Sequence, residues 1–162
     1  MGSDVHEYSS APGDAMPASY RIYPHLNIVL VLFRGDITVD QNVETLTRYR
    51  EDPLFDGGQH ILLDVMDCRF PENFFAEMGR IAQRLTAYHE ARDPRARTSI
   101  FAPGKVNFGI CKLYRDTVRA RMPYPLDVFR DPESALVYAE LDPRDPEVRS
   151  LLGSVGIGSV SG

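Results

Sequence analysis

The 162-residue chain lacks most of the features that reveal a protein's class from its sequence. Its two cysteines, Cys68 and Cys111, lie far apart and form neither a disulfide framework nor a CxxC metal or redox pair. No apolar run approaches the roughly 18 residues that a membrane-spanning helix needs. The N-terminus has neither the charged start nor the apolar stretch of a signal peptide. These absences favour a cytoplasmic protein with structural thiols.

Positive charge is also scarce. Lys and Arg number 18 against 23 Asp and Glu, which gives a formal net charge of −5 and a pI near 5.3. A nucleic-acid partner is not expected, because neutralising phosphates requires clustered cations. The chain has no GxxxxGK[ST] or GxGxxG phosphate-binding motif, and its four histidines show no metal-ligand spacing. We therefore expect no cofactor and no metal.

The chain does contain enough apolar residues, 43%, to bury one sizeable core. Residues 1–18 are rich in Ser, Gly and Pro without a hydrophobic period, and they predict a disordered N-terminal arm. Two Asp-Pro pairs, at 142–143 and 145–146, precede a Gly- and Ser-rich end, so residues 142–162 predict a flexible tail. A single α/β domain is expected over 19–141.

The best-defined unit is a strand followed by an amphipathic helix. The apolar run from His60 to Asp67 follows two glycines and predicts a buried strand. From Glu72 to Tyr88, apolar residues recur at steps of three and four and predict one helix with a wide apolar stripe. The stripe contains Phe74, Met78, Ile81, Leu85 and Tyr88. We expect this helix to cover the strand in the middle of a sheet.

The other elements alternate in the same way. Strands are predicted at 19–24, 28–33, 98–102 and 126–129, and helices at 39–50, at 106–122 and from 132 onward. Thr38 with Gln41 has the spacing of a capping box, and a turn at 25–27 favours antiparallel pairing of the first two strands. The order ββαβαβαβα predicts an α/β fold whose mixed sheet opens with an antiparallel hairpin.

Three stretches carry a resemblance to a known family. They are 31–38, where a strand passes through Gly35 and Asp36 into a helix, 61–64, where a strand ends in Asp64, and 127–131 with Ala135 and Leu136. With the element order, they resemble the anti-sigma-factor-antagonist (STAS, SpoIIAA-like) superfamily. The resemblance implies a protein-interaction module, often controlled by phosphorylation of a Ser or Thr after the central strand. No Ser or Thr lies between Thr47 and Thr86, so that switch does not carry over.

Polar residues gather at the carboxyl ends of the predicted strands, where open α/β sheets bind ligands. This candidate ligand or partner edge comprises Asp64, Asp67, Cys68, Glu72, Gly104, Lys105 and Asn107. Asp64 and Asp67 are three residues apart on a strand and are expected to point to opposite faces, so they do not form an acid–base pair. Cys68 near a helix start would have a depressed pKa. An ordinary β-to-α turn is the simpler interpretation of Gly104.

The third helix carries a basic set, Lys112, Arg115 and Arg119, which is a candidate surface for an acidic partner or simply a solvated face. Three functions stay open. The first is a non-enzymatic STAS-like module that regulates or docks another protein, or itself as a homodimer. The second is a small-ligand or lipid-binding domain that uses the strand-carboxyl edge. The third, an enzyme working through Cys68 or Asp64, is the least supported, because no catalytic motif is assembled.

Overall fold

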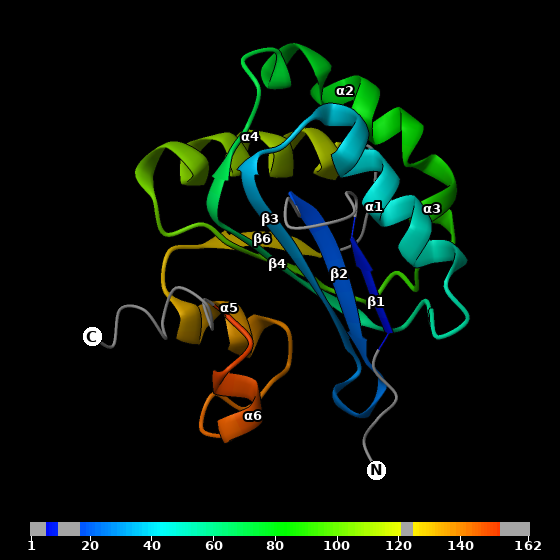
Figure 1. Ribbon diagram of the computed structural model, residues 1–162, viewed down its shortest axis with the longest axis vertical. Coiled ribbons are helices and arrows are strands. Elements are labelled where there is room, and N and C mark those ends of the chain that lie inside the picture. The colour runs from blue at the N-terminus through cyan, green and yellow to red at the C-terminus, as the bar shows by residue number, and fades with distance from the viewer. Residues whose placement is uncertain (1–5, 10–16, 121–124, 153–162) are drawn as a thin grey trace.

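The computed structural model describes residues 6–9, 17–120 and 125–152. Its strands form one mixed sheet of six, in the order β1-β2-β3-β4-β5-β6 (Figure 1). They are β1 (His6–Ser9), β2 (Ala18–Tyr23), β3 (Ile28–Asp36), β4 (His60–Arg69), β5 (Thr98–Phe101) and β6 (Leu126–Phe129). The first three are antiparallel and β3 to β6 are parallel. The predicted α/β class, antiparallel opening hairpin and interior position of β4 are confirmed.

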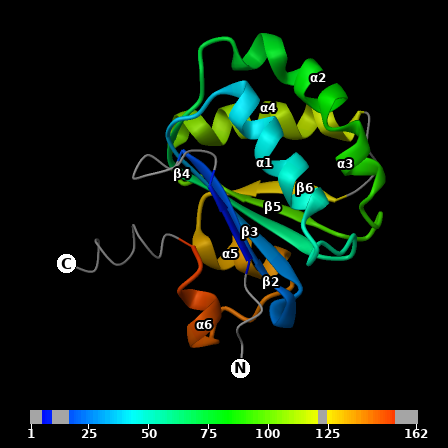
Figure 2. The same ribbon diagram turned by 45° about the vertical axis from the view of Figure 1, so that its right-hand side comes forward.

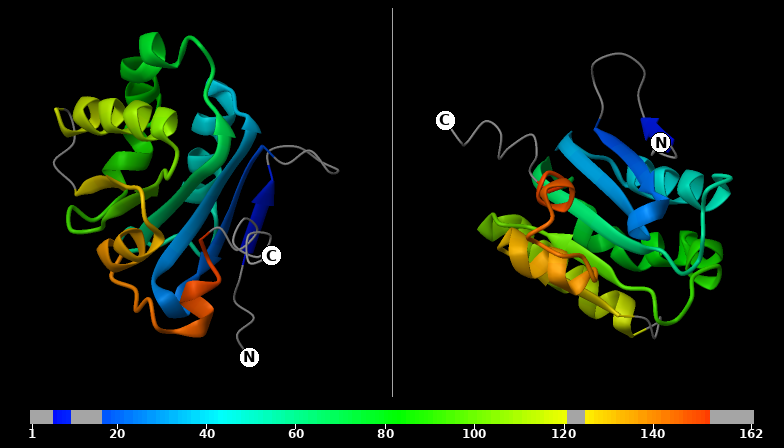
Figure 3. Two further views of the ribbon diagram at one scale, coloured as in Figure 1. Left: turned by 90° about the vertical axis from the view of Figure 1, so that its left-hand side faces the viewer. Right: turned by 90° about the horizontal axis from the view of Figure 1, so that it is seen from below.

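Helices cover both faces of this sheet (Figures 1 and 2). One face carries α1 (Val39–Glu51), α2 (Phe74–Arg84), α3 (Thr86–Glu90) and α4 (Lys105–Arg119). The other carries α5 (Pro132–Tyr138) and α6 (Pro146–Arg149), as the view from below shows (Figure 3, right). From β3 to β6 each crossover advances to the next strand in one direction, so right-handed connections place α1, α2 and α4 on the same side. The short 3-10 helix η1 (Pro24–Leu26) joins β2 to β3.

The sheet separates two apolar cores. The larger core lies under α1 to α4, and the smaller one lies between the sheet and α5 with α6. Side chains that were predicted to form the helical stripe, Phe74, Met78, Ile81 and Leu85, are all buried in the larger core. The amphipathic segment therefore covers β4, as its period predicts.

Two segments near the chain ends differ from the sequence prediction. The predicted arm over 1–18 includes β1, which pairs along β2, and Ala18, which is fully buried at the start of β2. The predicted tail over 142–162 includes α6, whose Val148 is buried together with Leu151 and Leu152 in the smaller core. Both segments are too short to show a period, and both are ordered by what they pack against. Residues 1–5 and 10–16 of the predicted arm and 153–162 of the predicted tail lie outside the described residues.

The helix predicted over 72–88 is two helices. Thr86 Oγ1 donates a hydrogen bond to the Gln83 carbonyl at 2.6 Å, and Leu85 leaves helical geometry with a ψ of 15°. A threonine hydroxyl that bonds the backbone competes with the helical ladder. The apolar stripe continues across the break, because Leu85 and Tyr88 are both buried. The spacing of the apolar residues therefore did not reveal the break between α2 and α3.

Candidate functional site

A β-bulge in β4 determines where the candidate aspartates point. Leu32 of β3 pairs with Asp64, and Arg34 pairs with Asp67, so two steps along β3 match three along β4. Leu32 and Arg34 point to one face of the sheet, and their partners must share that face. The prediction of opposite faces for Asp64 and Asp67 is therefore wrong, because the extra residue shifts the alternation.

The two aspartates nevertheless have different environments. Asp64 is buried, and its Oδ1 accepts a hydrogen bond from the Met66 amide at 2.9 Å within the bulge. Asp67 is exposed, and its carboxylate lies 3.6 Å from Arg34 Nη1. Each carboxylate thus has a local structural contact, and neither contact brings the pair together as catalytic partners.

Cys68 and Asn107 form a clamp between the bulge and α4. The Asn107 amide donates to the carbonyls of Val65 at 2.9 Å and Cys68 at 2.8 Å, and it lies 3.8 Å from Cys68 Sγ. The thiol points into the larger core, where burial raises the pKa of Cys68, with Cys111 and Asp64 acting in the same direction. The thiol is therefore protonated near neutral pH, opposite to the depressed pKa that a helix start would produce.

The remaining edge residues lie in solvent. Glu72 is exposed ahead of α2, Gly104 caps α4 with an extended backbone, and Lys105 begins that helix as an exposed cation. The seven predicted edge residues thus fall into two groups. Asp64, Cys68 and Asn107 are buried or half-buried at the bulge, and the exposed ones are Asp67, Glu72, Gly104 and Lys105. None of them lines the cavity that lies beneath the helices.

The basic set on α4 is largely engaged within the molecule. Arg115 binds Asp127 of β6 at 2.8 Å and Asp116 at 3.1 Å. Arg119 donates to the Leu126 carbonyl at 2.8 Å. These two cations fasten α4 to the edge of the sheet. Lys112 instead lies 5.2 Å from the centre of the Phe108 ring and is exposed.

Exposed apolar side chains gather on α2 and α4. Among the described residues the large exposed ones are Phe75, at 53%, Val106, at 73%, Leu113, at 49%, and Val137, at 53%. All but Val137 belong to α2 or α4. Val106, the half-buried Ile110 and Leu113 recur at steps of four and three, which places them in one row on α4.

Phe75 lies on the flank of α2 that is turned toward this row. Arg84 lies nine residues after Phe75 and therefore on the opposite side of α2. Its side chain binds Asp40 of α1 at 2.8 Å. The opposite flank therefore faces α4, the neighbour of α2 on its other side (Figure 1). We call Phe75, Val106, Ile110 and Leu113 the α2–α4 face. Sequence reasoning did not isolate it, although the seven-residue spacing of Val106 and Leu113 was a readable signal.

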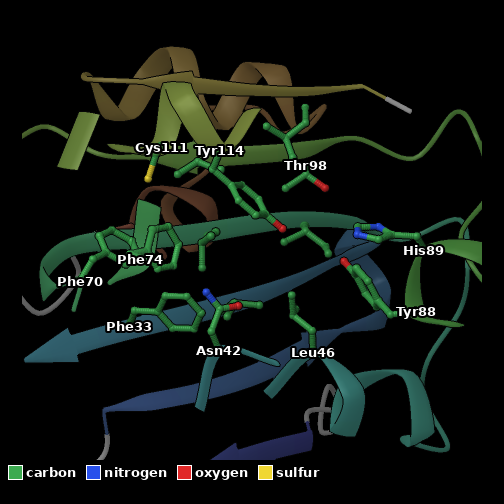
Figure 4. Close-up of a pocket in the computed structure, with 15 residues that line it drawn as sticks. Phe33, Asn42, Leu46, Phe70, Phe74, Tyr88, His89, Thr98, Cys111 and Tyr114 are labelled. Carbon is green, nitrogen blue, oxygen red and sulfur yellow. The ribbon is translucent and has the colours of Figure 1, made fainter. Parts of the chain in front are cut away.

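A cavity of about 40 Å³ lies inside the larger core, between the sheet and the helices (Figure 4). Fifteen residues from β3 to β6 and α1 to α4, with Phe70 before α2, line it. Most are aliphatic or aromatic, and none is Asp, Glu, Lys or Arg. Asn42 was also missed from the sequence, although it lies four and seven residues before the apolar Leu46 and Tyr49 on one helical stripe.

Comparison of the chain with protein-family models, with curated proteins and with solved structures finds no match. In the part of the chain that the structure describes, no helix is both long and apolar enough to cross a membrane. Over the same ranges, His, Cys, Asp and Glu side chains do not gather in threes as metal ligands would. The fold, the α2–α4 face and the cavity are therefore the features of this chain that indicate a function.

Proposed function

We propose that this protein is a non-enzymatic, STAS-like regulatory module that docks another protein through its α2–α4 face. The observation that carries the proposal is that three of the four large exposed apolar side chains among the described residues, Phe75, Val106 and Leu113, lie on the adjacent helices α2 and α4. Single exposed apolar residues are ordinary on a protein surface, but neighbouring ones mark interaction sites. The order of strands and helices supports the STAS-like part of the proposal.

The charges beside this face indicate the chemistry of the partner. Lys105 and Lys112 are exposed and each directly precedes an apolar member of the row, Val106 and Leu113. Lys105 and Lys112 are seven residues apart, two turns, so they form a row of cations about a quarter turn around α4 from the row of Val106 and Leu113. Gly109 and the exposed Asp116 lie between the two rows, and Arg115 binds the Asp116 carboxylate at 3.1 Å. We propose a partner segment with apolar anchors and acidic flanks, since complementary charge speeds encounter and fixes orientation.

The proposal includes neither catalysis nor a phosphoserine switch. The thiol of Cys68 is kept protonated by its buried position, so it is a poor nucleophile. The corner between β4 and α2 contains no hydroxyl side chain, because residues 48–85 include neither Ser nor Thr. Regulation would then depend on the presence of the partner.

Site-specific photo-cross-linking in living cells tests this function. A photoreactive residue replaces Leu113, and a matched control replaces Val137, which is equally exposed but lies on α5 across the sheet. We expect a discrete adduct from position 113 that contains a second protein. The adduct should disappear when Lys105 and Lys112 are both changed to Glu, because the flanking charge is reversed. Equal adducts from both positions, or none from either, would contradict the proposal, and an adduct of two copies of this chain would identify self-association instead.

A further inference from the structure

We propose that the cavity in the larger core binds a small neutral amphiphile, a molecule with one hydroxyl or carbonyl group and a short apolar tail. This site is separate from the α2–α4 face, and its ligand is independent of the proposed docking function. The inference depends on the polar side chains that point into an otherwise apolar space (Figure 4).

Two polar groups enter the middle of the cavity from different helices. Figure 4 shows the Asn42 amide pointing in from α1 and the Tyr114 hydroxyl pointing in from α4. Asn42 is 93% buried, since only 7% of its surface is exposed. Within the described residues, neither the Asn42 amide nor the Tyr114 hydroxyl makes a hydrogen bond to another side chain or to the backbone. A buried amide without a partner costs about 1–3 kcal/mol, so this arrangement calls for a hydrogen-bonding guest.

The two ends of the cavity differ in character. At one end lie the rings of Phe33, Phe70 and Phe74, and the Phe70 and Phe74 rings are 4.6 Å apart between centroids and tilted by 38°. At the other end Arg92 donates to Thr98 Oγ1 at 2.5 Å and, more weakly, to the Tyr88 hydroxyl at 3.4 Å. Those hydroxyls are already engaged. A ligand would therefore place its polar group between the two helices and its tail against the phenylalanines.

The cavity selects against charged molecules. Its lining contains no formal charge, because burial and the nearby Arg92 lower the pKa of His89 to about 4 and leave the imidazole neutral at pH 7. Burial also raises the pKa of Tyr114, so that its hydroxyl keeps its proton and can donate. Taking an unpaired carboxylate into such a space costs far more than taking in a neutral hydroxyl.

The volume restricts the size of the ligand. About 40 Å³ is enough for one or two water molecules, whereas an engineered cavity of about 150 Å³ accepts benzene. The structure thus accommodates the polar group, and a tail has to displace the half-buried Phe70 ring toward solvent. An alcohol with a flexible chain fits this description better than a rigid ring.

Methyl NMR titration of the whole chain with 1-hexanol tests the proposal, with sodium hexanoate at pH 7 as the matched anionic probe. We expect saturable shifts at Leu46, Ile61 and Ile100 with hexanol and none with hexanoate. From 1-butanol to 1-hexanol, each added CH₂ should tighten binding roughly four-fold while apolar contact is available. The Asn42→Leu and Tyr114→Phe variants should each weaken hexanol binding roughly ten-fold, and the exposed Asn73→Leu should not.

The same spectra show whether each variant is folded, so loss of binding is not confused with loss of structure. Asn42→Leu is expected to retain a dispersed spectrum, since it replaces a buried amide with an apolar group of similar size. If wild type shows no saturable shift with hexanol, the cavity holds water only and the proposal is overturned. Equal affinity in wild type and Asn42→Leu would overturn it as well, as would hexanoate binding as tightly as hexanol.

Discussion

Replacing Asn107 tests the clamp that joins α4 to the β4 bulge. Its amide donates two hydrogen bonds, at 2.9 and 2.8 Å, to carbonyls that are partly shielded from water. Each bond contributes about 0.5–1.5 kcal/mol, and stranding the carbonyls adds about 1–3 kcal/mol. Asn107→Ala should therefore lower the free energy of unfolding by about 3 kcal/mol. For a chain of this size, the melting temperature should fall by about 6–12 °C.

Urea unfolding followed by far-ultraviolet circular dichroism measures this loss, provided that the m value does not change. Asn107→Asp keeps the shape but turns a carboxylate oxygen toward the carbonyls, so it should destabilise at least as much as Ala. The control is Asn73→Ala, because Asn73 is exposed and makes no capping hydrogen bond, and it should cost less than about 0.5 kcal/mol. If Asn107→Ala is no worse than Asn73→Ala, the clamp does not stabilise the fold.

Three further predictions concern the framework around the site. Burial lowers the pKa of His89 to about 4 in the folded chain. As the pH falls below about 6.5, the His89 imidazole is therefore protonated in the unfolded chain before it is protonated in the folded chain. Wild type should therefore lose about 3 kcal/mol more stability than His89→Gln between pH 7 and pH 4, measured as paired urea curves. Thr38→Ala removes a capping box that is present in full, and it should cost about 1 kcal/mol in thermal unfolding; an unchanged melting temperature would show that the capping box does not stabilise α1. Leu152→Ala should cost about 2–5 kcal/mol, because Leu152 is fully buried; a cost near zero would restore the prediction of a flexible tail.

Local signals predicted much of the fold. The capping box at Thr38 and the turn at 25–27 both appear in the structure as the sequence indicates. In each case the groups that form the hydrogen bond are three residues apart, so the local sequence is enough to predict the contact. The alternation of strands and helices then fixed the parallel part of the sheet through the handedness of crossovers.

The features that sequence reasoning missed depend on distant partners. β1 exists because β2 offers it a pairing edge, and α6 is ordered by the smaller core. The bulge in β4 cannot be read from its apolar run, yet it places Asp64 and Asp67 on the same face of the sheet and not on opposite faces. Arg115 and Arg119 resembled a free basic surface until the fold brought Asp127 beside them.

The candidate site shows the same limit. The sequence directed attention to polar residues at strand ends, whereas the structure uses several of them to close the bulge. The α2–α4 face consists of apolar residues that no other element covers. The cavity is a space beside Asn42 that the surrounding side chains do not fill. Both are properties of packing between elements, which spacing along one helix only suggests.

The most direct test of the docking role is a titration of the purified chain with the protein captured from position 113. Calorimetry should show that Leu113→Asp weakens binding at least ten-fold, because a carboxylate would be buried against apolar anchors. Val137→Asp, with the same change on the opposite side of the sheet, should bind as wild type does. If both variants bind with wild-type affinity, the partner docks elsewhere and the role assigned to the α2–α4 face is wrong.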